Sequence, residues 1–331
     1  KGYFATKGDG SDYLVDFGEF YCGVVDLTNP NAYEWYKNEV IKKHSLDIGM
    51  DGWMADFGEY LPTDDIRLYS GESPMIEHNR WPALWAKCNY EAVKERNRLG
   101  EVVYFSQKYA PLLWAGDQSV DFSIHDGLAT VICAALSSGM TGCGLNHSDI
   151  GGYTSLFDNT RTKELFLRWS EMAMFTPVMR THEGNRPDTN FQYYGDEDCM
   201  EQLARLVDIY TMLAPYMKTL VKENAEKGIP VQRPLFLHHE EDKKAYAIQY
   251  EYLLGRDLLV APVYLEDREN WDVYLPEGEW VHLWTGDPYQ GGDVNVDAPL
   301  GYTPAFYLRD SEYAPLFEEI RRKYGTGAVT D

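Results

Sequence analysis

The stretch Asp51-Gly52-Trp53-Met54-Ala55-Asp56-Phe57-Gly58-Glu59 has the pattern of a β-strand that ends in a carboxylate. The run from Leu46 to Met54 has strand character, and Asp56 falls where that strand should end. In a barrel of alternating strands and helices, an acid at the carboxyl end of a strand is more typical of catalysis than of structure. Because an unpaired buried charge is costly, such a residue normally needs a partner or a chemical role.

Strand-like apolar runs alternate with amphipathic helices over residues 1–227. The pattern predicts helices over residues 31–43, 79–99, 126–138, 162–175 and 197–227, the last as one helix or two. It predicts strands over residues 46–56, 101–105, 112–115, 141–150 and 178–182. This alternation is typical of a parallel sheet, and at this length it favours an α/β fold of the (β/α)8 TIM-barrel class.

The number of predicted barrel strands is about five, whereas closure of the barrel needs eight. Open edges of a parallel sheet are rarely tolerated. We therefore expect the chain to be the C-terminal part of a longer protein, in which the upstream part of the same polypeptide completes the barrel. Finding all eight barrel strands within residues 1–331 would contradict this expectation.

The pattern changes after Gly228, where short strands and turns dominate. The predicted strands cover residues 231–238, 258–263, 271–275, 280–282 and 305–308, with turns at 276–278 and 291–292 and a helix over 316–324. Such spacing is typical of a small β-sandwich. We predict two domains: residues 1–227 as the C-terminal part of a catalytic barrel, and residues 228–331 as a β-sandwich domain with a terminal helix.

The overall charge limits the partners. The formal net charge is −23, which argues against binding to nucleic acid or to an anionic membrane surface. No apolar run is long enough to span a bilayer. The five cysteines are odd in number and have no metal-like CxxC spacing, so we expect reduced thiols, a cytoplasmic protein and no metal site. The sequence leaves open whether the protein forms a homo-oligomer.

A second predicted strand, 112–115, also leads into an acid, Asp117. If both strands belong to one barrel, Asp56 and Asp117 point into the same mouth. Two carboxylates in one aromatic-walled cleft are typical of glycoside hydrolysis, and a retaining enzyme places them roughly 5–5.5 Å apart. One acid must be ionised, and the other must keep its proton at working pH.

A set of motifs in this order resembles glycoside hydrolase family 31, and within it the sulfoquinovosidases. The motifs are Asp26-Leu27-Thr28-Asn29-Pro30, Gly52-Trp53-Met54-Ala55-Asp56-Phe57-Gly58-Glu59, Trp114-Ala115-Gly116-Asp117, Ser148-Asp149-Ile150-Gly151-Gly152, Met179-Arg180-Thr181-His182, Arg233-Pro234-Leu235-Phe236 and Leu254-Gly255-Arg256-Asp257-Leu258-Leu259-Val260-Ala261-Pro262-Val263. The resemblance implies a retaining α-glycosidase without a cofactor. Its small-molecule substrate would be an α-sulfoquinovoside such as sulfoquinovosyl glycerol from plant sulfolipid.

The resemblance also implies roles for individual residues. Asp56 would be the nucleophile and Asp117 the general acid/base. His182 would bind sugar hydroxyls, Asp149 would lie near the sugar pocket, and Trp114 would line it. The alternatives are a core histidine, a loop-ordering carboxylate and a packed tryptophan. Within the opening motif, Asp51 and Glu59 would hydrogen-bond to neighbouring groups and position them, without covalent chemistry of their own.

Tyr153 separates the possible substrates. Related α-glucosidases usually carry Phe at this place, whereas the sulfoquinovosidases carry Tyr, whose hydroxyl can donate to a sulfonate oxygen. The alternative is that Tyr153 acts only as a Phe with a polar edge. The competing functions are an α-glucosidase or α-xylosidase of the same family and a catalytically incomplete carbohydrate-binding fragment.

Two departures from the family pattern concern positive groups. An Arg-containing, Gly-rich loop would precede the segment Ser106-Gln107-Lys108-Tyr109, but here Phe105 is followed directly by Ser106. The Arg and Trp that contact the sulfonate in the resembled enzymes would lie upstream of Lys1. We therefore expect residues outside this chain to complete the pocket.

Overall fold

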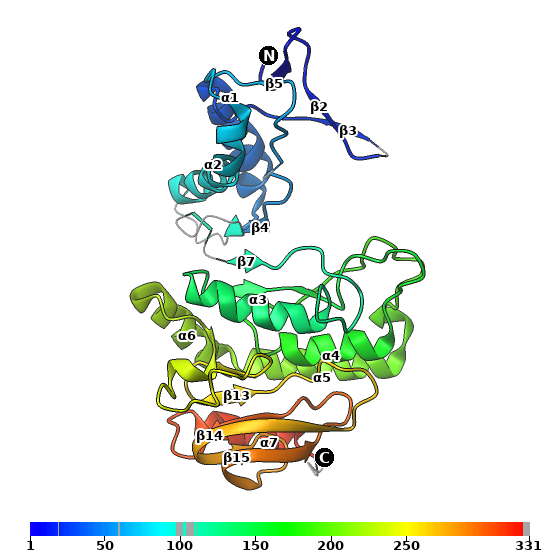
Figure 1. Cartoon of the computed structure of the whole chain (residues 1–331), viewed down its shortest axis with the longest axis vertical. Coiled ribbons are helices and arrows are strands. Elements are labelled where there is room, and N and C mark those ends of the chain that lie inside the picture. Colours follow the sequence, from blue (N-terminus) through cyan, green and yellow to red (C-terminus); the bar gives the residue numbers. More distant parts are fainter. Residues whose placement is uncertain (19, 59, 97–101, 104–108, 111, 327–331) are drawn as a thin grey trace. The chain divides into compact units, whose positions relative to one another are not determined.

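The computed structural model describes residues 1–18, 20–58, 60–96, 102–103, 109–110 and 112–326 (Figure 1). Glu59 and most of the predicted strand 101–105, together with residues 106–108, lie outside this description. The chain divides into two compact units, Lys1–Leu113 and Trp114–Asp331. The predicted domain boundary after residue 227 falls inside the second unit and stays a prediction.

The first unit packs two helical segments against short strands. Its helices are α1 (Pro30–Trp35), which continues as a π-helix over Tyr36–Lys42, and α2 (Pro74–Glu95). Its strands are β1 (Thr6–Lys7), β2 (Leu14–Asp16), β3 (Tyr21–Gly23), β4 (Trp53–Met54), β5 (Ile66–Arg67) and β6 (Val102–Val103). The predicted helix over 31–43 is confirmed. It begins where Asn29 caps the helix by accepting from the backbone N–H of Asn31, with Pro30 in the first turn.

The long strand predicted over residues 46–56 is wrong in extent. Leu46–Ile48 form a short 3₁₀ helix, and Gly49 ends it at a φ of +104°. Only Trp53 and Met54 are extended, and they pair in parallel with Val102 and Val103 of β6. Apolar character alone did not separate a buried helical turn from a buried strand. Asp56 nevertheless lies two residues beyond the strand, as predicted.

The second unit contains the remaining helices and strands, except that β7 begins at Leu113, the last residue of the first unit. Its helices are α3 (Leu128–Met140), α4 (Lys163–Ala173), α5 (Glu197–Met212), α6 (Ala214–Lys227) and α7 (Ala314–Tyr324). Before the C-terminal sheet, β8 (Asn146–His147) pairs with β7 (Leu113–Trp114), and β9 (Asp149–Ile150) pairs in parallel with β10 (Arg180–Thr181). The segment 197–227 forms two helices, since Leu213 and Pro215 interrupt the pattern.

The C-terminal strands form one antiparallel sheet in the order β11-β12-β13-β16-β14-β15. They are β11 (Gln232–Arg233), β12 (Tyr252–Leu254), β13 (Leu258–Val260), β14 (Asn270–His282), β15 (Pro288–Asp297) and β16 (Ala305–Leu308). Alternate side chains join two buried clusters: Leu258 and Tyr307 pack with α7, whereas Leu259 and Phe306 pack with the first half of β14. By hydrogen bonding, the strands predicted as a sandwich are thus a single sheet, in which the inner strands β12, β13 and β16 are buried on both faces.

Three details of this domain were predicted wrongly. The segment 231–238 is extended only at Gln232–Arg233, because Pro234 lacks an N–H and a 3₁₀ turn follows. Residues 276–278 are no hairpin turn: β14 continues through them as a bulge between Leu275 and Glu279. Gly291 lies in β15 opposite that bulge, where a Cβ would come within 2.8 Å of the Pro276 carbonyl oxygen.

Candidate active site

The end of β4 is fixed against helix α2. The Trp85 indole N–H donates to the Ala55 carbonyl over 3.1 Å, and the Phe57 N–H donates to Asp56 Oδ1 over 2.8 Å. Phe57 adopts a φ of +59°, which is unusual for a bulky residue and marks local backbone strain. A Cβ at Gly58 would overlap the Trp85 ring. The backbone therefore holds the half-buried Asp56 carboxylate in one place.

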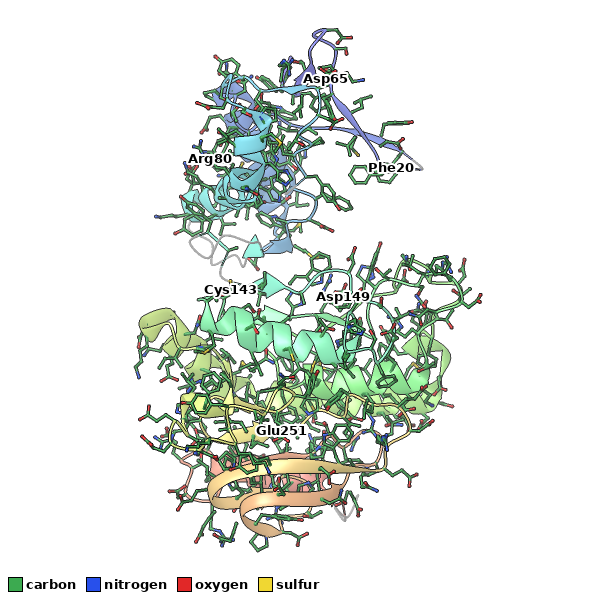
Figure 2. The ribbon with its side chains drawn as sticks, in the orientation of Figure 1. Phe20, Asp65, Arg80, Cys143, Asp149 and Glu251 are labelled. Atoms are coloured by element: carbon green, nitrogen blue, oxygen red, sulfur yellow. The ribbon has the colours of Figure 1, made fainter. Side chains whose placement is uncertain are left out.

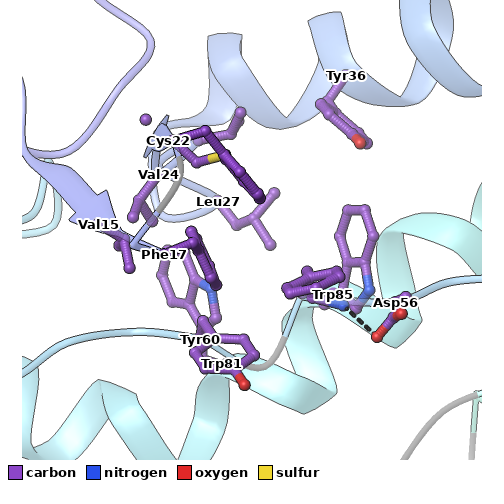
Figure 3. A pocket seen from close by; sticks show the side chains of 15 residues that line it. Val15, Phe17, Cys22, Val24, Leu27, Tyr36, Asp56, Tyr60, Trp81 and Trp85 are labelled. Carbon is purple, nitrogen blue, oxygen red and sulfur yellow. Dashed lines mark hydrogen bonds between the residues drawn. The ribbon is translucent and has the colours of Figure 1, made fainter. Parts of the chain in front are cut away.

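Asp56 lies at the margin of an apolar cavity of about 310 Å³ within the first unit (Figure 3). Among the described residues that line this cavity, Asp56 is the only acid. Aromatic rings dominate the walls: Phe17 stacks on Phe20 at 5.3 Å and meets Phe57 edge-on at 5.4 Å. The cavity thus combines one carboxylate with flat apolar surfaces, which suits the apolar faces of a sugar ring.

A buried carboxylate organises the second unit (Figure 2). Asp149 is 0% exposed, and its Oδ1 accepts from the Trp114 indole N–H over 3.1 Å. The same oxygen pairs with the Arg180 guanidinium, which lies 5.7 Å from the Trp114 ring centroid. Burial raises the pKa of Asp149, while the charge of Arg180 opposes that shift. Parallel pairing of β9 with β10 places Arg180 directly beside Asp149.

Arg180 is a site residue that the sequence reasoning did not assign. Its signal was present in the motif Met179-Arg180-Thr181-His182, where a cation precedes the predicted sugar-binding histidine by two residues. The structure shows that Asp149 orders both Trp114 and Arg180. The loop-ordering alternative for Asp149 and a place beside the candidate site are therefore compatible.

The rings of Tyr153 and His182, two residues that the sequence predicts to bind the substrate, lie in contact. Their ring centroids are 5.0 Å apart at an interplanar angle of 83°. The Gly184 N–H donates to His182 Nδ1 over 3.0 Å. Nδ1 is therefore unprotonated, so the neutral ring carries its proton on Nε2, where it can donate to a hydroxyl.

Asp117 follows Gly116, whose φ is +97°, and its side chain is exposed. Backbone bonds join this segment to the one that carries Tyr153: the Thr154 hydroxyl donates to the Asp117 carbonyl over 2.8 Å. The Tyr153 and Thr154 N–H groups both donate to the Gln118 carbonyl over 2.9 Å. The second unit thus contains Trp114, Asp117, Asp149, Tyr153 and His182, whereas Asp56 belongs to the first unit.

Gly152, the second of the two glycines that follow Ile150, has no room for a side chain. Gly152 has a φ of +76°, and a Cβ there would come within 2.7 Å of the Ser119 carbonyl oxygen. Gly152→Ala should therefore lower the midpoint of thermal unfolding more than Gly228→Ala does. Gly228 has a φ of +72° but nothing within 4 Å of its Cβ position, so it measures only the left-handed backbone cost of roughly 1–2 kcal/mol. Equal midpoints for the two variants would contradict the steric argument.

Arg161 is a second residue that the sequence did not single out. It is 3% exposed, and its guanidinium donates to carbonyls of several loops, including His182 O at 2.7 Å. Burial lowers the pKa of Arg161 to about 10, so the group is still charged at neutral pH.

The described part of the chain contains no group of three or more His, Cys, Asp or Glu side chains that could hold a metal ion. Every described helix is too short or too polar to cross a lipid bilayer.

Comparison with protein families gives two matches in chain order. Residues 1–220 match the glycosyl hydrolases family 31 TIM-barrel domain, and residues 228–311 match the glycosyl hydrolase family 31 C-terminal domain. These matches confirm the predicted barrel class and the predicted C-terminal domain that follows it.

Individual relatives narrow the comparison. The chain is 58% identical over 97% of its length to a sulfoquinovosidase of Escherichia coli and 56% identical over 97% to one of Agrobacterium fabrum. It covers 48% and 49% of those two proteins. An α-xylosidase of Lactiplantibacillus pentosus is 30% identical over 88% of the chain, which covers 38% of that protein.

Among solved structures, a sulfoquinovosidase from E. rectale in complex with an aza-sugar inhibitor is similar at a TM-score of 0.95 and 77% identity. The match covers 98% of this chain and 50% of that one. The chain therefore spans about half the length of each of these three sulfoquinovosidases.

Proposed function

This chain belongs to glycoside hydrolase family 31, and we propose that the full-length protein is a retaining α-glycosidase that cleaves α-sulfoquinovosides. The observation that carries the proposal is the similarity to sulfoquinovosidases: 56–58% identity over 97% of the chain, against 30% for an α-xylosidase. Tyr153 and His182, with their rings 5.0 Å apart, supply hydroxyl and imidazole donors that fit such a substrate.

The proposed reaction is a double displacement. The Asp56 carboxylate attacks the anomeric carbon while Asp117 gives its proton to the departing oxygen, so the aglycone leaves as an alcohol. Asp117, now a carboxylate, takes a proton from water as the water oxygen attacks the same carbon. The bond to Asp56 breaks, and the sugar leaves with its α-configuration retained.

The remaining residues would bind the sugar. His182 would donate from Nε2 to a sugar hydroxyl, because its Nδ1 already accepts from Gly184. Asp149 fixes the Trp114 ring and the Arg180 guanidinium, and these two groups would form part of the wall of the sugar pocket. The Tyr153 hydroxyl would donate to a sulfonate oxygen without adding a formal charge. Further positive groups would come from the upstream part of the polypeptide.

Tyr153→Phe should lower kcat/KM for nitrophenyl α-sulfoquinovoside by about 10- to 100-fold in the full-length enzyme, because a hydrogen bond to a charged group contributes about 1.5–3 kcal/mol. The same variant should keep its activity on nitrophenyl α-glucoside, since that substrate lacks the sulfonate. Steady-state rates on the two substrates give the ratio of kcat/KM for the sulfoquinovoside to kcat/KM for the glucoside.

The same paired assay tests the function as a whole. A wild-type enzyme that preferred the glucoside or a xyloside would overturn the proposal in favour of an α-glucosidase or α-xylosidase. Binding of the sulfonated sugar without turnover would favour a carbohydrate-binding protein instead. A Tyr153→Phe enzyme with an unchanged ratio would leave the glycosidase proposal but remove Tyr153 from sulfonate recognition.

We further propose that the enzyme works in a reducing compartment such as the cytoplasm. All five cysteines are free in the structure, and Cys88 and Cys199 are buried. Burial raises the pKa of Cys88 to about 12 and that of Cys199 to about 11, so both are inert thiols. Assembly into a homo-oligomer stays a prediction, and the sedimentation velocity of the full-length protein measures it.

A further inference from the structure

The most unusual buried group outside the proposed catalytic pair is the Arg161 guanidinium. It is 3% exposed, and the described part of the chain places no carboxylate within salt-bridge distance of it. Its direct partners are carbonyl oxygens, the Gln192 amide oxygen at 3.1 Å and the face of Phe166 at 5.6 Å, while the charges of Asp149 and Glu183 act on it from beyond contact distance. Because burying a cation without a contacting carboxylate is expensive, this arrangement needs a reason beyond packing.

The hydrogen bonds of Arg161 join three segments, at residues 150–152, 182–183 and 191–192. Nη1 donates to Ile150 O at 3.3 Å, to Gly152 O at 3.4 Å and to His182 O at 2.7 Å. Nη2 donates to Glu183 O at 3.2 Å, and Nε donates to Phe191 O at 3.0 Å. The loops after β9 and β10 are therefore tied to one guanidinium.

These two loops carry Tyr153 and His182. Tyr153 directly follows Gly152, and the Tyr153 carbonyl also accepts from the Asn185 N–H over 3.0 Å. Asn190 adds a further link, since its Oδ1 accepts both from the Ser155 hydroxyl and from the backbone N–H of Arg161. A Cβ at Gly151 would overlap the Arg161 side chain, which shows how closely the loop packs on it.

We propose that Arg161 is a positioning residue that sets the separation of Tyr153 and His182, and thereby determines selectivity for the sulfonated sugar. This inference rests on the proposed function of the same site. The planar guanidinium spans both loops with its fork of N–H donors, which a lysine ammonium at the end of a flexible stem cannot do. Loosening the pair removes two contacts from a sulfonated sugar but only the His182 contact from a neutral one.

The test is Arg161→Lys in the full-length enzyme, which keeps the charge and loses the fork. We expect kcat/KM for nitrophenyl α-sulfoquinovoside to fall about 10- to 100-fold, the order that a 1 Å misplacement costs. The ratio of sulfoquinovoside to glucoside activity should fall with it, whereas loss of folded enzyme would lower both activities equally. In a double-mutant cycle with Tyr153→Phe, the two effects on the ratio should be non-additive.

Arg168→Lys is the matched control. Arg168 is 2% exposed and also donates to carbonyls, those of Arg268 and Ala298, but it pairs with Glu171 away from the Tyr153 loop. It should lower the thermal midpoint while leaving the substrate ratio unchanged. If Arg161→Lys does not fold, Gln192→Leu removes one acceptor of Arg161 and should move the ratio in the same direction.

An unchanged ratio in the folded Arg161 variant, or in Gln192→Leu when that variant alone folds, would overturn the proposal, as would strict additivity with Tyr153→Phe. A wild-type enzyme without preference for the sulfonated substrate would instead overturn the proposed function. In that case the role of Arg161 is tested by a double-mutant cycle of Arg161→Lys with His182→Ala, measured as kcat/KM for the glucoside. Additive losses in the two variants would again reject the positioning role of Arg161.

Discussion

Asp56→Asn should abolish turnover in the full-length enzyme, with a loss in kcat of at least about 10⁴-fold, the order seen when a covalent nucleophile is removed. The amide has almost the same shape as the carboxylate but is a poor nucleophile, and no glycosyl-enzyme can form. The backbone around Asp56 is fixed by Trp85 and Phe57, so the fold should persist. Steady-state rates with nitrophenyl α-sulfoquinovoside test the loss of turnover, and circular dichroism tests whether the fold persists.

A smaller residue at this position gives a sharper readout. Asp56→Gly with added azide should restore release of nitrophenol, because a small anion can enter the space of the missing carboxylate. Attack from that face yields the β-glycosyl azide, which NMR identifies. Asp47→Asn is the control: Asp47 is an exposed acid near the same motif, paired with Arg96 at 3.0 Å, and its loss should change kcat by less than about twofold. Near-normal turnover in Asp56→Asn would reject the assignment.

Asp117→Asn should give a loss that depends on the leaving group. Nitrophenol leaves without protonation, so the first step with nitrophenyl α-sulfoquinovoside should stay fast, while hydrolysis of the glycosyl-enzyme slows without its base. Nitrophenol should then appear in a burst whose size matches the enzyme concentration. With sulfoquinovosyl glycerol, whose alkoxide needs a proton, kcat/KM should fall about 10²- to 10⁴-fold, the usual contribution of general acid–base catalysis.

Asp126→Asn is the control for this prediction. Asp126 is an exposed acid on the same stretch of chain and accepts from the Ser119 hydroxyl over 3.2 Å. Its replacement should produce no burst and leave both substrates nearly unaffected. Equal losses on the nitrophenyl and glyceryl substrates in Asp117→Asn would show that Asp117 is not the general acid/base.

The order of elements could be predicted from sequence because it depends on local patterns. The helices 31–43 and 162–175 were found within a few residues, and the structure shows that the side chains of Asn29 and Thr162 cap them. Strand lengths were predicted poorly. Leu46–Ile48 form a helical turn despite their apolar character, and the length of β14 depends on its partners β15 and β16 rather than on its own residues.

For the candidate site, the sequence named residues but not the contacts between them, and their roles stay predictions. Tyr153 and His182 were named from motifs, and the structure brings their rings together. Arg180 and Arg161 were missed for different reasons. Arg180 lay inside a quoted motif, but only the register of β9 against β10 shows that it pairs with Asp149. Arg161 belongs to no motif, and its partners are backbone carbonyls, which every residue carries and no sequence pattern marks.

The sequence by itself determined the family, through its motifs, and with it the barrel, the C-terminal domain and the residue types available for the chemistry, because motifs and element patterns are local. Only the tertiary structure decided the environment of each group. It buried Asp149 and Arg161, gave one an ion pair and the other a set of carbonyl oxygens, and set Tyr153 against His182. These outcomes depend on contacts between segments far apart in the chain, where burial makes an electrostatic or hydrogen-bonding partner decisive.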